Sequence, residues 1–173
     1  MGCGHDVEAV LITGVYGVGK SSVAAEIAEL LEERGVAYAA LDLDWLAWFD
    51  TGSDDPAAEY RMMLANLTAM VANYLAAGVR FFVLARSIRD RSELDRLAAE
   101  LPMPLRVVRL ELPLKEIEQR LAADLTSGRQ RDLRNAAAWI AASRGQGVED
   151  LTVPNDRAIH TVAVEILDWL AWK

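Results

Sequence analysis

The fold of this chain is decided by Val10-Leu-Ile-Thr-Gly-Val-Tyr-Gly-Val-Gly-Lys-Ser-Ser22. Up to Thr13 the residues are apolar or β-branched, which is typical of a buried strand. From Gly14 to Ser21 they follow the pattern Gly-x-x-x-x-Gly-Lys-Ser, and apolar residues recur at helical spacing from Val23 onward. The stretch therefore predicts a strand, then a glycine-rich loop, then a helix.

The loop in this stretch has the residue types of a phosphate-binding P-loop. Its glycines let the backbone approach a ligand closely, and its N–H groups form an anion site at a helix N-terminus. Lys20 can reach the outer phosphates of a nucleotide, and the Ser21 hydroxyl can bind Mg²⁺. A glycine-rich turn without a ligand is the plainer interpretation, but strand, helix and lysine–hydroxyl pair together favour a nucleotide site. Its candidate residues are Gly14, Val15, Tyr16, Gly17, Val18, Gly19, Lys20, Ser21 and Ser22.

Composition and charge narrow the class of protein further. The chain has 173 residues, of which 53% are hydrophobic, so it can form one domain with a sizeable core. Its formal net charge of −8 argues against a general nucleic-acid binder, which needs a basic face. The single cysteine, Cys3, can form no internal disulfide, which fits a reducing cytoplasm. Because no apolar run approaches ~20 residues and no signal-peptide pattern is present, we expect a cytoplasmic protein that binds no membrane.

Strands and helices are expected to alternate along the rest of the chain. Residues 126–132 are polar and contain a glycine, which predicts a loop, with the next helix at 136–143. Ser92 and Asp95 have the spacing of a capping box, and Asp156 is a candidate cap for the last helix. Apolar runs separated by helical patterns predict an α/β domain with a parallel sheet covered on both faces. The expected strands are residues 9–13, 36–41, 80–85, 105–110 and 151–153.

Two carboxylates follow the second expected strand, at the edge where ligands bind in parallel sheets. Asp42 and Asp44 lie two residues apart, so they face the same side in an extended segment. They could be two solvated acids in a turn, but their place at this edge favours a site role. Trp45 and Trp48 come next and could wall a pocket for a second substrate.

Several arginines come at other candidate positions. Arg86 directly follows the apolar third strand, and Arg89 and Arg91 could either bind an anionic group or be a solvated helix start. Arg120 could contact a nucleotide or simply pair with Glu116 one helical turn earlier. Arg129 and Arg131 lie in the expected loop, where either could close over phosphates or be plainly solvated; they are candidates for a mobile lid.

The chain resembles a family, the small P-loop kinases of the adenylate-kinase-like fold. Adenylylsulfate, gluconate and shikimate kinases and chloramphenicol phosphotransferase are its closer analogues. The resemblance covers most of the chain and implies a three-layer P-loop NTPase fold with sheet order 2-3-1-4-5. It rests on GVYGVGKSS, on LDLDW after the second strand, on ARSIRDR after the third, and on EIEQRLAADLTSGRQR followed by VPNDR.

The resemblance also implies roles for particular residues. Asp44 best matches the residue that holds or deprotonates the acceptor hydroxyl, with Asp42 as its neighbour. The arginines after the third strand would hold the acceptor, and Arg129 or another arginine of a lid at about 126–134 would close over the phosphates. The segment after the fifth strand would line the adenine pocket through Asn155, Asp156 and Arg157, with Arg120 also on the nucleotide.

The chain departs from the family pattern at two places. Asp124 stands where several relatives carry a further arginine, four residues after Arg120. No acidic residue ends the third strand, where other P-loop enzymes bind Mg²⁺, which leaves Ser21 as the expected direct metal ligand.

The preferred interpretation is an ATP-dependent, Mg²⁺-requiring phosphotransferase that acts on a hydroxyl of a small molecule. Lys20 would neutralise charge on the phosphates, Asp44 would serve the acceptor, and lid arginines would exclude water. A non-catalytic ATP-binding sensor or regulatory module is the alternative, and an NTPase that performs mechanical work is less favoured. The acceptor, the preferred base and the oligomeric state stay open.

Overall fold

A parallel sheet forms the centre of the computed structural model, which describes residues 7–50, 52, 55, 57–122 and 127–172, with only the backbone for 127–131. Within these residues the sheet has five strands in the order β2-β3-β1-β4-β5, which confirms the expected α/β fold and strand order. The strands are β1 (Glu8–Thr13), β2 (Tyr38–Asp42), β3 (Phe81–Ala85), β4 (Leu105–Glu111) and β5 (Leu151–Pro154).

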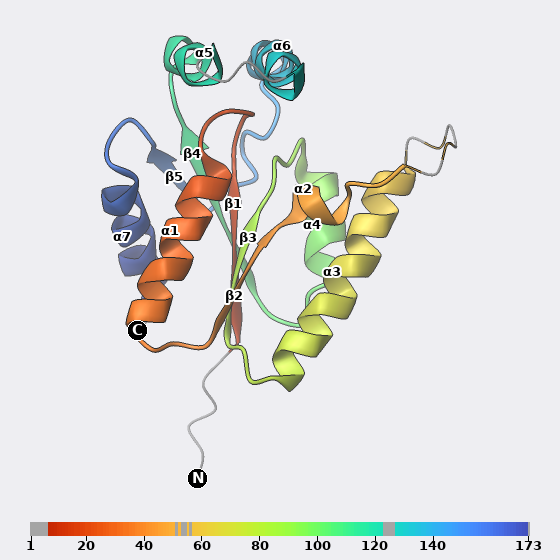
Figure 1. Cartoon of the computed structure of the whole chain (residues 1–173), viewed down its shortest axis with the longest axis vertical. Coiled ribbons are helices and arrows are strands. Elements are labelled where there is room, and N and C mark those ends of the chain that lie inside the picture. Colours follow the sequence, from red (N-terminus) through yellow and green to blue (C-terminus); the bar gives the residue numbers. More distant parts are fainter. Residues whose placement is uncertain (1–6, 51, 53–54, 56, 123–126, 173) are drawn as a thin grey trace.

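Helices cover both faces of this sheet, as Figure 1 shows. One face carries α1 (Lys20–Glu33) and α7 (Ile159–Leu170), and the other carries α3 (Ala58–Ala76) and α4 (Arg91–Ala99). The central strand β1 contributes to both cores because its side chains alternate between the faces. Val10 and Ile12 pack with the α1–α7 side, whereas Ala9 and Leu11 pack with the α3–α4 side. All four are fully buried, which explains the uninterrupted apolar run.

The remaining helices lie at the carboxyl edge of the sheet. These are α2 (Leu43–Leu46), α5 (Leu114–Ala122) and α6 (Ser127–Ala141). The predicted loop at 126–132 is therefore wrong from Ser127 onward, and residue 126 lies outside the described residues. Helix α6 packs beside α5 and buries Ala136 and Trp139 in the core, so tertiary packing outweighs the polar composition of its first turns.

Two helix starts also differ from the sequence prediction. Helix α4 begins after Asp90, whose carboxylate accepts a hydrogen bond from the Glu93 N–H at 2.9 Å. The Glu93 carboxylate in turn accepts from the Arg89 N–H at 2.9 Å, so the cap lies two residues before Ser92. Helix α7 begins after Ala158 without a side-chain cap, so Asp156 is not its N-cap.

The strand register brings the ends of three strands together. Asp42 of β2 is opposite Ala85 of β3, and Ala85 is opposite Ile12 of β1. The residues that follow these strands therefore meet at one edge, among them Gly14 and Arg86. Among the described residues, no helix is long and apolar enough to cross a membrane.

Candidate functional site

The loop after β1 has the backbone conformation of a phosphate-binding loop. Gly14 and Gly19 have φ of 137° and 101°, a region that favours glycine. A Cβ on Gly14 would lie 2.7 Å from the Leu110 carbonyl oxygen, and one on Gly19 would lie 2.7 Å from Asn155 Nδ2. These two positions therefore require glycine for space as well as for conformation. Lys20, the first residue of α1, is buried, and its Nζ donates to the Val15 carbonyl at 3.1 Å.

Two side chains from other elements hold this loop in place. Asn155, just after β5, is buried, and its Nδ2 donates to the Val18 carbonyl at 2.7 Å. Arg120 of α5 donates to the Asn155 carbonyl at 2.8 Å and approaches the Val18 carbonyl at 3.5 Å. Both residues are nucleotide-site candidates from the sequence, and both touch the P-loop backbone. The contacts fix the loop relative to β5 and α5.

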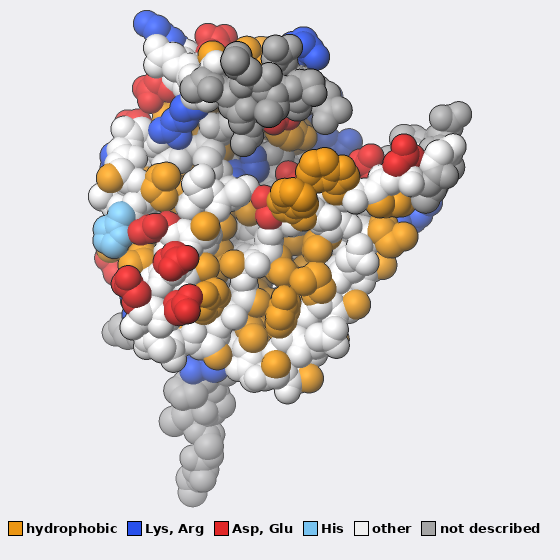
Figure 2. All heavy atoms as spheres, viewed as in Figure 1, with side chains coloured by type: hydrophobic (Ala, Val, Ile, Leu, Met, Phe, Trp, Pro, Cys, Tyr) orange, Lys and Arg blue, Asp and Glu red, His pale blue; other side chains and the backbone are white. Residues whose placement is uncertain are grey.

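A cavity of about 420 Å³, here called the P-loop cavity, opens beside this loop. Figure 2 shows side chains of both charges in a hollow at this edge of the sheet. The cavity brings together most of the residues expected on the nucleotide side with Asp44 from the acceptor side. Its lining residues are Tyr16, Gly17, Gly19, Lys20, Ser21, Ser22, Asp44, Arg120, Leu121, Asp132, Asn155 and Ile159.

Asp42 joins the P-loop helix to the start of α2. The Ser21 hydroxyl donates to Asp42 Oδ2 at 2.6 Å, and Asp42 Oδ1 accepts the Asp44 N–H at 3.1 Å. A hydroxyl and a carboxylate next to the P-loop lysine are oxygen donors of the kind that Mg²⁺ prefers. Among the described residues, no group of three or more His, Cys, Asp or Glu could hold a metal by itself. The donor set present therefore fits an ion that also takes oxygens from phosphates and water.

Asp44 lines the P-loop cavity and also contacts Arg86, the residue that follows β3. Its carboxylate accepts a hydrogen bond from Arg86 at 2.8 Å, and the Arg86 Nε lies 3.8 Å from the carboxylate of Glu93, which is buried. In the cavity, 56% of the Asp44 side chain is accessible. Desolvation there raises the pKa of Asp44; the Arg86 charge opposes this, and the Asp42 charge adds to it.

A smaller cavity of about 190 Å³, here called the Tyr60 cavity, lies next to the P-loop cavity and shares Tyr16 with it. The Glu93 carboxylate holds the two arginines of this cavity, because it accepts a hydrogen bond from Arg89 Nε at 3.1 Å and also faces Arg86. The Tyr60 hydroxyl donates to the Glu93 carbonyl at 2.8 Å. The lining residues are Tyr16, Glu59, Tyr60, Arg86, Ser87, Arg89, Glu93 and Trp139.

Sequence reasoning missed several residues of these cavities. Tyr60 and Glu93 belong to helices that read as ordinary amphipathic segments, and only the Asp90-x-x-Glu93 cap could have drawn attention to Glu93. Trp139 and Asp132 come from α6, and the sequence predicted a loop at residues 126–132, where the first turns of this helix lie. Tyr16, Asp44 and Asp132 line the P-loop cavity together; burial raises the pKa of Tyr16, the charges of Asp44 and Asp132 add to this, and the Arg86 charge opposes it.

Other predicted site residues lie outside the two cavities or outside the described residues. Arg157 pairs with Glu165 of α7 on the surface, and Arg91 lies on the exposed start of α4. Trp45 is 67% exposed and its ring contacts that of Trp48 at a tilt of 34°, with centroids 4.8 Å apart, and it lines neither cavity. The side chain of Arg129 lies outside the described residues. Their assigned roles stay predictions.

The fold and the loop define a class: this chain has the fold of the small P-loop kinases, which confirms the resemblance at the level of structure. A sugar kinase from Janibacter has a TM-score of 0.67 and 19% identity, with 95% of each chain covered. A gluconokinase from Sinorhizobium meliloti has a TM-score of 0.66 and 21% identity, covering 95% of this chain and 91% of that one. The Mycobacterium tuberculosis APS kinase, in complex with AMPPNP and APS, has a TM-score of 0.64 and 24% identity, covering 96% and 99%. No family model and no curated protein sequence matches the chain.

Proposed function

We propose that this protein is an ATP-dependent phosphotransferase that moves a phosphoryl group to a hydroxyl of a small molecule. One observation carries the proposal: Lys20 and Ser21 of the P-loop line the same cavity as Asp44. A phosphate held by the loop and a hydroxyl held by Asp44 would therefore meet in one space. The solved kinases with this fold support the same reaction class.

The nucleotide half of the site would act through charge and position. P-loop N–H groups and Lys20 would bind the phosphates, and Lys20 would leave the Val15 carbonyl to do so. Ser21 and Asp42 would hold Mg²⁺, Ser21 directly and Asp42 through the metal's water shell. The ion would supply Lewis-acid stabilisation of the phosphate charge. Arg120 and Asn155 would keep the loop in register.

The acceptor half would orient and activate a hydroxyl. Asp44 would accept the hydroxyl proton, and its raised pKa makes it a better base than an ordinary aspartate. Arg86 would fix the direction of the Asp44 carboxylate. The acceptor would extend into the Tyr60 cavity, whose aromatic walls and arginine pair suit a small polar molecule with a flat face. Neither nucleic acid nor a membrane is part of this proposal.

A second candidate function, an ATP-binding sensor, is favoured by one different observation. Trp45 and Trp48 are 67% and 76% exposed and lie directly after Asp44 in the chain. An exposed aromatic pair at the rim of a nucleotide site could contact a partner protein. In that case Asp44 would serve no acceptor, and ATP binding alone would be the output.

The test combines a binding assay with a transfer assay. Mg²⁺–ATP is expected to raise the melting temperature of the protein, and Lys20→Ala is expected to abolish that increase. ADP release is then measured with a library of hydroxylated metabolites, with Asp44→Asn as the matched variant. Acceptor-dependent ADP release that Asp44→Asn removes supports the kinase. A full thermal shift without ADP release from any acceptor supports the sensor, and an unchanged shift in Lys20→Ala contradicts both.

A further inference from the structure

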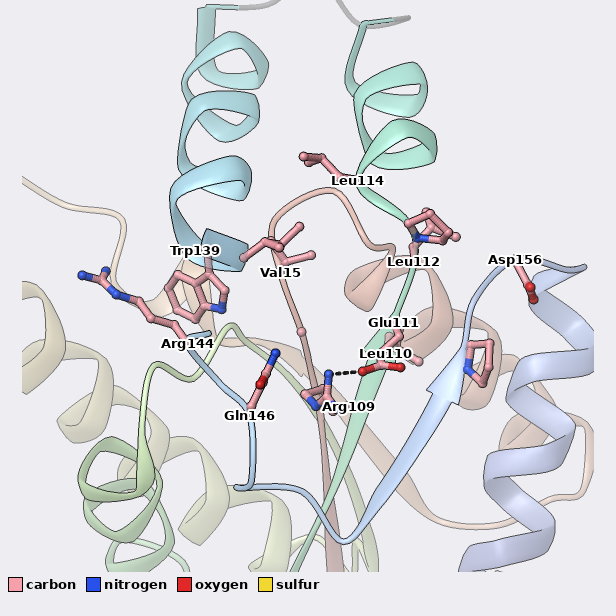
Figure 3. Close-up of a pocket in the computed structure, with 14 residues that line it drawn as sticks. Val15, Arg109, Leu110, Glu111, Leu112, Leu114, Trp139, Arg144, Gln146 and Asp156 are labelled. Carbon is pink, nitrogen blue, oxygen red and sulfur yellow. Dashed lines mark hydrogen bonds and ion pairs between the residues drawn. The ribbon is translucent and has the colours of Figure 1, made fainter. Parts of the chain in front are cut away.

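A third cavity, larger than the two at the site, lies between the ends of β4 and β5. We call it the β4–β5 cavity; its volume is about 510 Å³, within the range of small-molecule sites. It shares no lining residue with the P-loop cavity, and it shares only Trp139 with the Tyr60 cavity. Figure 3 shows its residues, which are Gly14, Val15, Arg109, Leu110, Glu111, Leu112, Pro113, Leu114, Trp139, Ile140, Arg144, Gln146, Pro154 and Asp156.

The walls of this cavity are mainly apolar, and its charged side chains are of both signs, with Arg109 and Arg144 as cations and Glu111 and Asp156 as carboxylates. Figure 3 shows the Trp139 ring on one side and the Arg109–Glu111 pair on the floor. The Arg109 guanidinium already has two carboxylate partners, since it donates to Glu111 Oε1 at 2.5 Å and lies 2.9 Å from Glu149 Oε1. Glu111 keeps its second carboxylate oxygen without a partner among the described residues, and its side chain is 49% exposed. Gln146 adds an amide, directed toward Val15 in Figure 3.

We propose that the β4–β5 cavity binds a planar nitrogen heterocycle with N–H donors, neutral or singly positive. The flat face would lie against Trp139 and the apolar wall, where aromatic groups are stabilised by burial and stacking. The N–H edge would donate to the Glu111 carboxylate and to the Gln146 side-chain oxygen. An anionic ligand does not fit at the Glu111 end, because Arg109 there already has two carboxylates and the guanidinium of the second lining cation, Arg144, is directed away from Glu111 in Figure 3.

Occupancy of this cavity is linked to nucleotide binding, because the two sites share the P-loop. Gly14 and Val15 form part of the β4–β5 wall, and the Val15 carbonyl is the acceptor of Lys20 Nζ. Trp139 packs edge-on against Tyr16 of the P-loop, with ring centroids 5.6 Å apart. A ligand that fixes Trp139 and Val15 changes the freedom of the loop that must bind phosphate. By linkage, the nucleotide changes the affinity of that ligand by the same factor.

The experiment uses full-length protein labelled with 5-fluorotryptophan and the probe 2-aminobenzimidazole, a planar heterocycle with N–H donors. Trp139→Phe identifies the ¹⁹F resonance of Trp139. The probe is expected to shift that resonance saturably, while benzoate, which is flat but anionic, leaves it unmoved. Glu111→Gln is expected to weaken the probe at least about tenfold, because it removes a charged hydrogen-bond acceptor. Gln146→Trp, a change at an exposed position, is expected to block the cavity and abolish the shift.

Each remaining outcome decides a part of the proposal. No shift of the Trp139 resonance, or equal shifts with benzoate, would overturn the site. If added AMP-PNP lowers the probe affinity in proportion to its concentration without limit, the two compete for the nucleotide site. That result would also overturn the proposed site. A finite, reciprocal change in the two affinities supports the linkage, and an unchanged probe affinity with AMP-PNP bound would overturn the linkage. Gln146→Trp is expected to bind AMP-PNP as the wild type does.

Discussion

Ser21 Oγ donates a 2.6 Å hydrogen bond to Asp42 Oδ2, which joins the first turn of the P-loop helix to the carboxyl end of β2. The other oxygen of Asp42 accepts the Asp44 N–H and so caps the short helix α2. One carboxylate therefore positions both the hydroxyl expected to bind Mg²⁺ and the backbone that carries the candidate base. On this geometry we expect Asp42 to act on the metal side and Asp44 to serve the acceptor.

The first prediction concerns Asp42 and the metal. Asp42→Asn keeps a cap for α2, because asparagine caps helices as well as aspartate does. It removes the negative charge beside Ser21, and loss of such an outer-sphere partner typically costs about 10–100-fold in metal affinity. We expect the Mg²⁺ concentration that half-saturates ATP turnover to rise by that factor. Titration of Mg²⁺ at fixed ATP measures it.

Asp95→Asn is the matched control for this change, since Asp95 is exposed on α4. It is expected to leave the Mg²⁺ requirement unchanged. If Asp42→Asn instead lowers turnover equally at every Mg²⁺ concentration, Asp42 serves the acceptor and not the metal.

The second prediction concerns the pH dependence of turnover. Desolvation raises the pKa of Asp44 above its ordinary value of 3.8, and Arg86 is the main influence that lowers it. A base must be unprotonated, so kcat/KM is expected to fall as pH drops through this raised pKa. Arg86→Gln removes the lowering charge, so the acid limb is expected to move to higher pH. Profiles of kcat/KM from about pH 4 to about pH 8 measure the shift, with Lys115→Gln as a charge-matched control.

The third prediction concerns stability and the same carboxyl. A carboxyl with a raised pKa in the folded state binds its proton more tightly there than in the unfolded chain. It therefore contributes stability at low pH that is lost as pH rises from 3.8 through the folded pKa. Asp44→Asn cannot lose this contribution, so its stability relative to the wild type is expected to increase with pH across that window. Urea unfolding at several pH values tests the sign, and a constant or decreasing difference would contradict it.

The sequence was informative where local pattern determines position. The P-loop motif required glycine at Gly14 and Gly19, and both have positive φ in contact with neighbouring elements. The parallel sheet and the order of its strands were also confirmed. The pairing of Asp44 with Arg86 could be anticipated as a shared edge, because both follow strands that align in register, but not as a contact.

The remainder depends on tertiary packing that no short pattern encodes. Glu93 reads as a solvated residue of α4, yet it is 2% exposed and faces two arginines. Trp139 reads as a packing residue, yet it lines two cavities because α6 folds back over the P-loop. The polar start of α6 suggested a loop, since composition alone does not reveal that a helix is stabilised by a distant neighbour.

The last prediction concerns Glu93, the buried carboxylate of the Tyr60 cavity. Glu93→Ala would leave Arg86 facing Asp44 alone and would remove the partner of Arg89. Loss of one member of a buried ion pair typically costs about 3–5 kcal/mol, so the free energy of unfolding in urea is expected to fall by that amount. Glu93→Gln keeps an oxygen that can accept the Arg89 N–H, and it is expected to cost less. Glu59→Ala changes an exposed glutamate of the same cavity and is expected to stay within about 0.5 kcal/mol of the wild type. Equal losses in Glu93→Ala and Glu59→Ala would show that Glu93 does not balance the arginine pair.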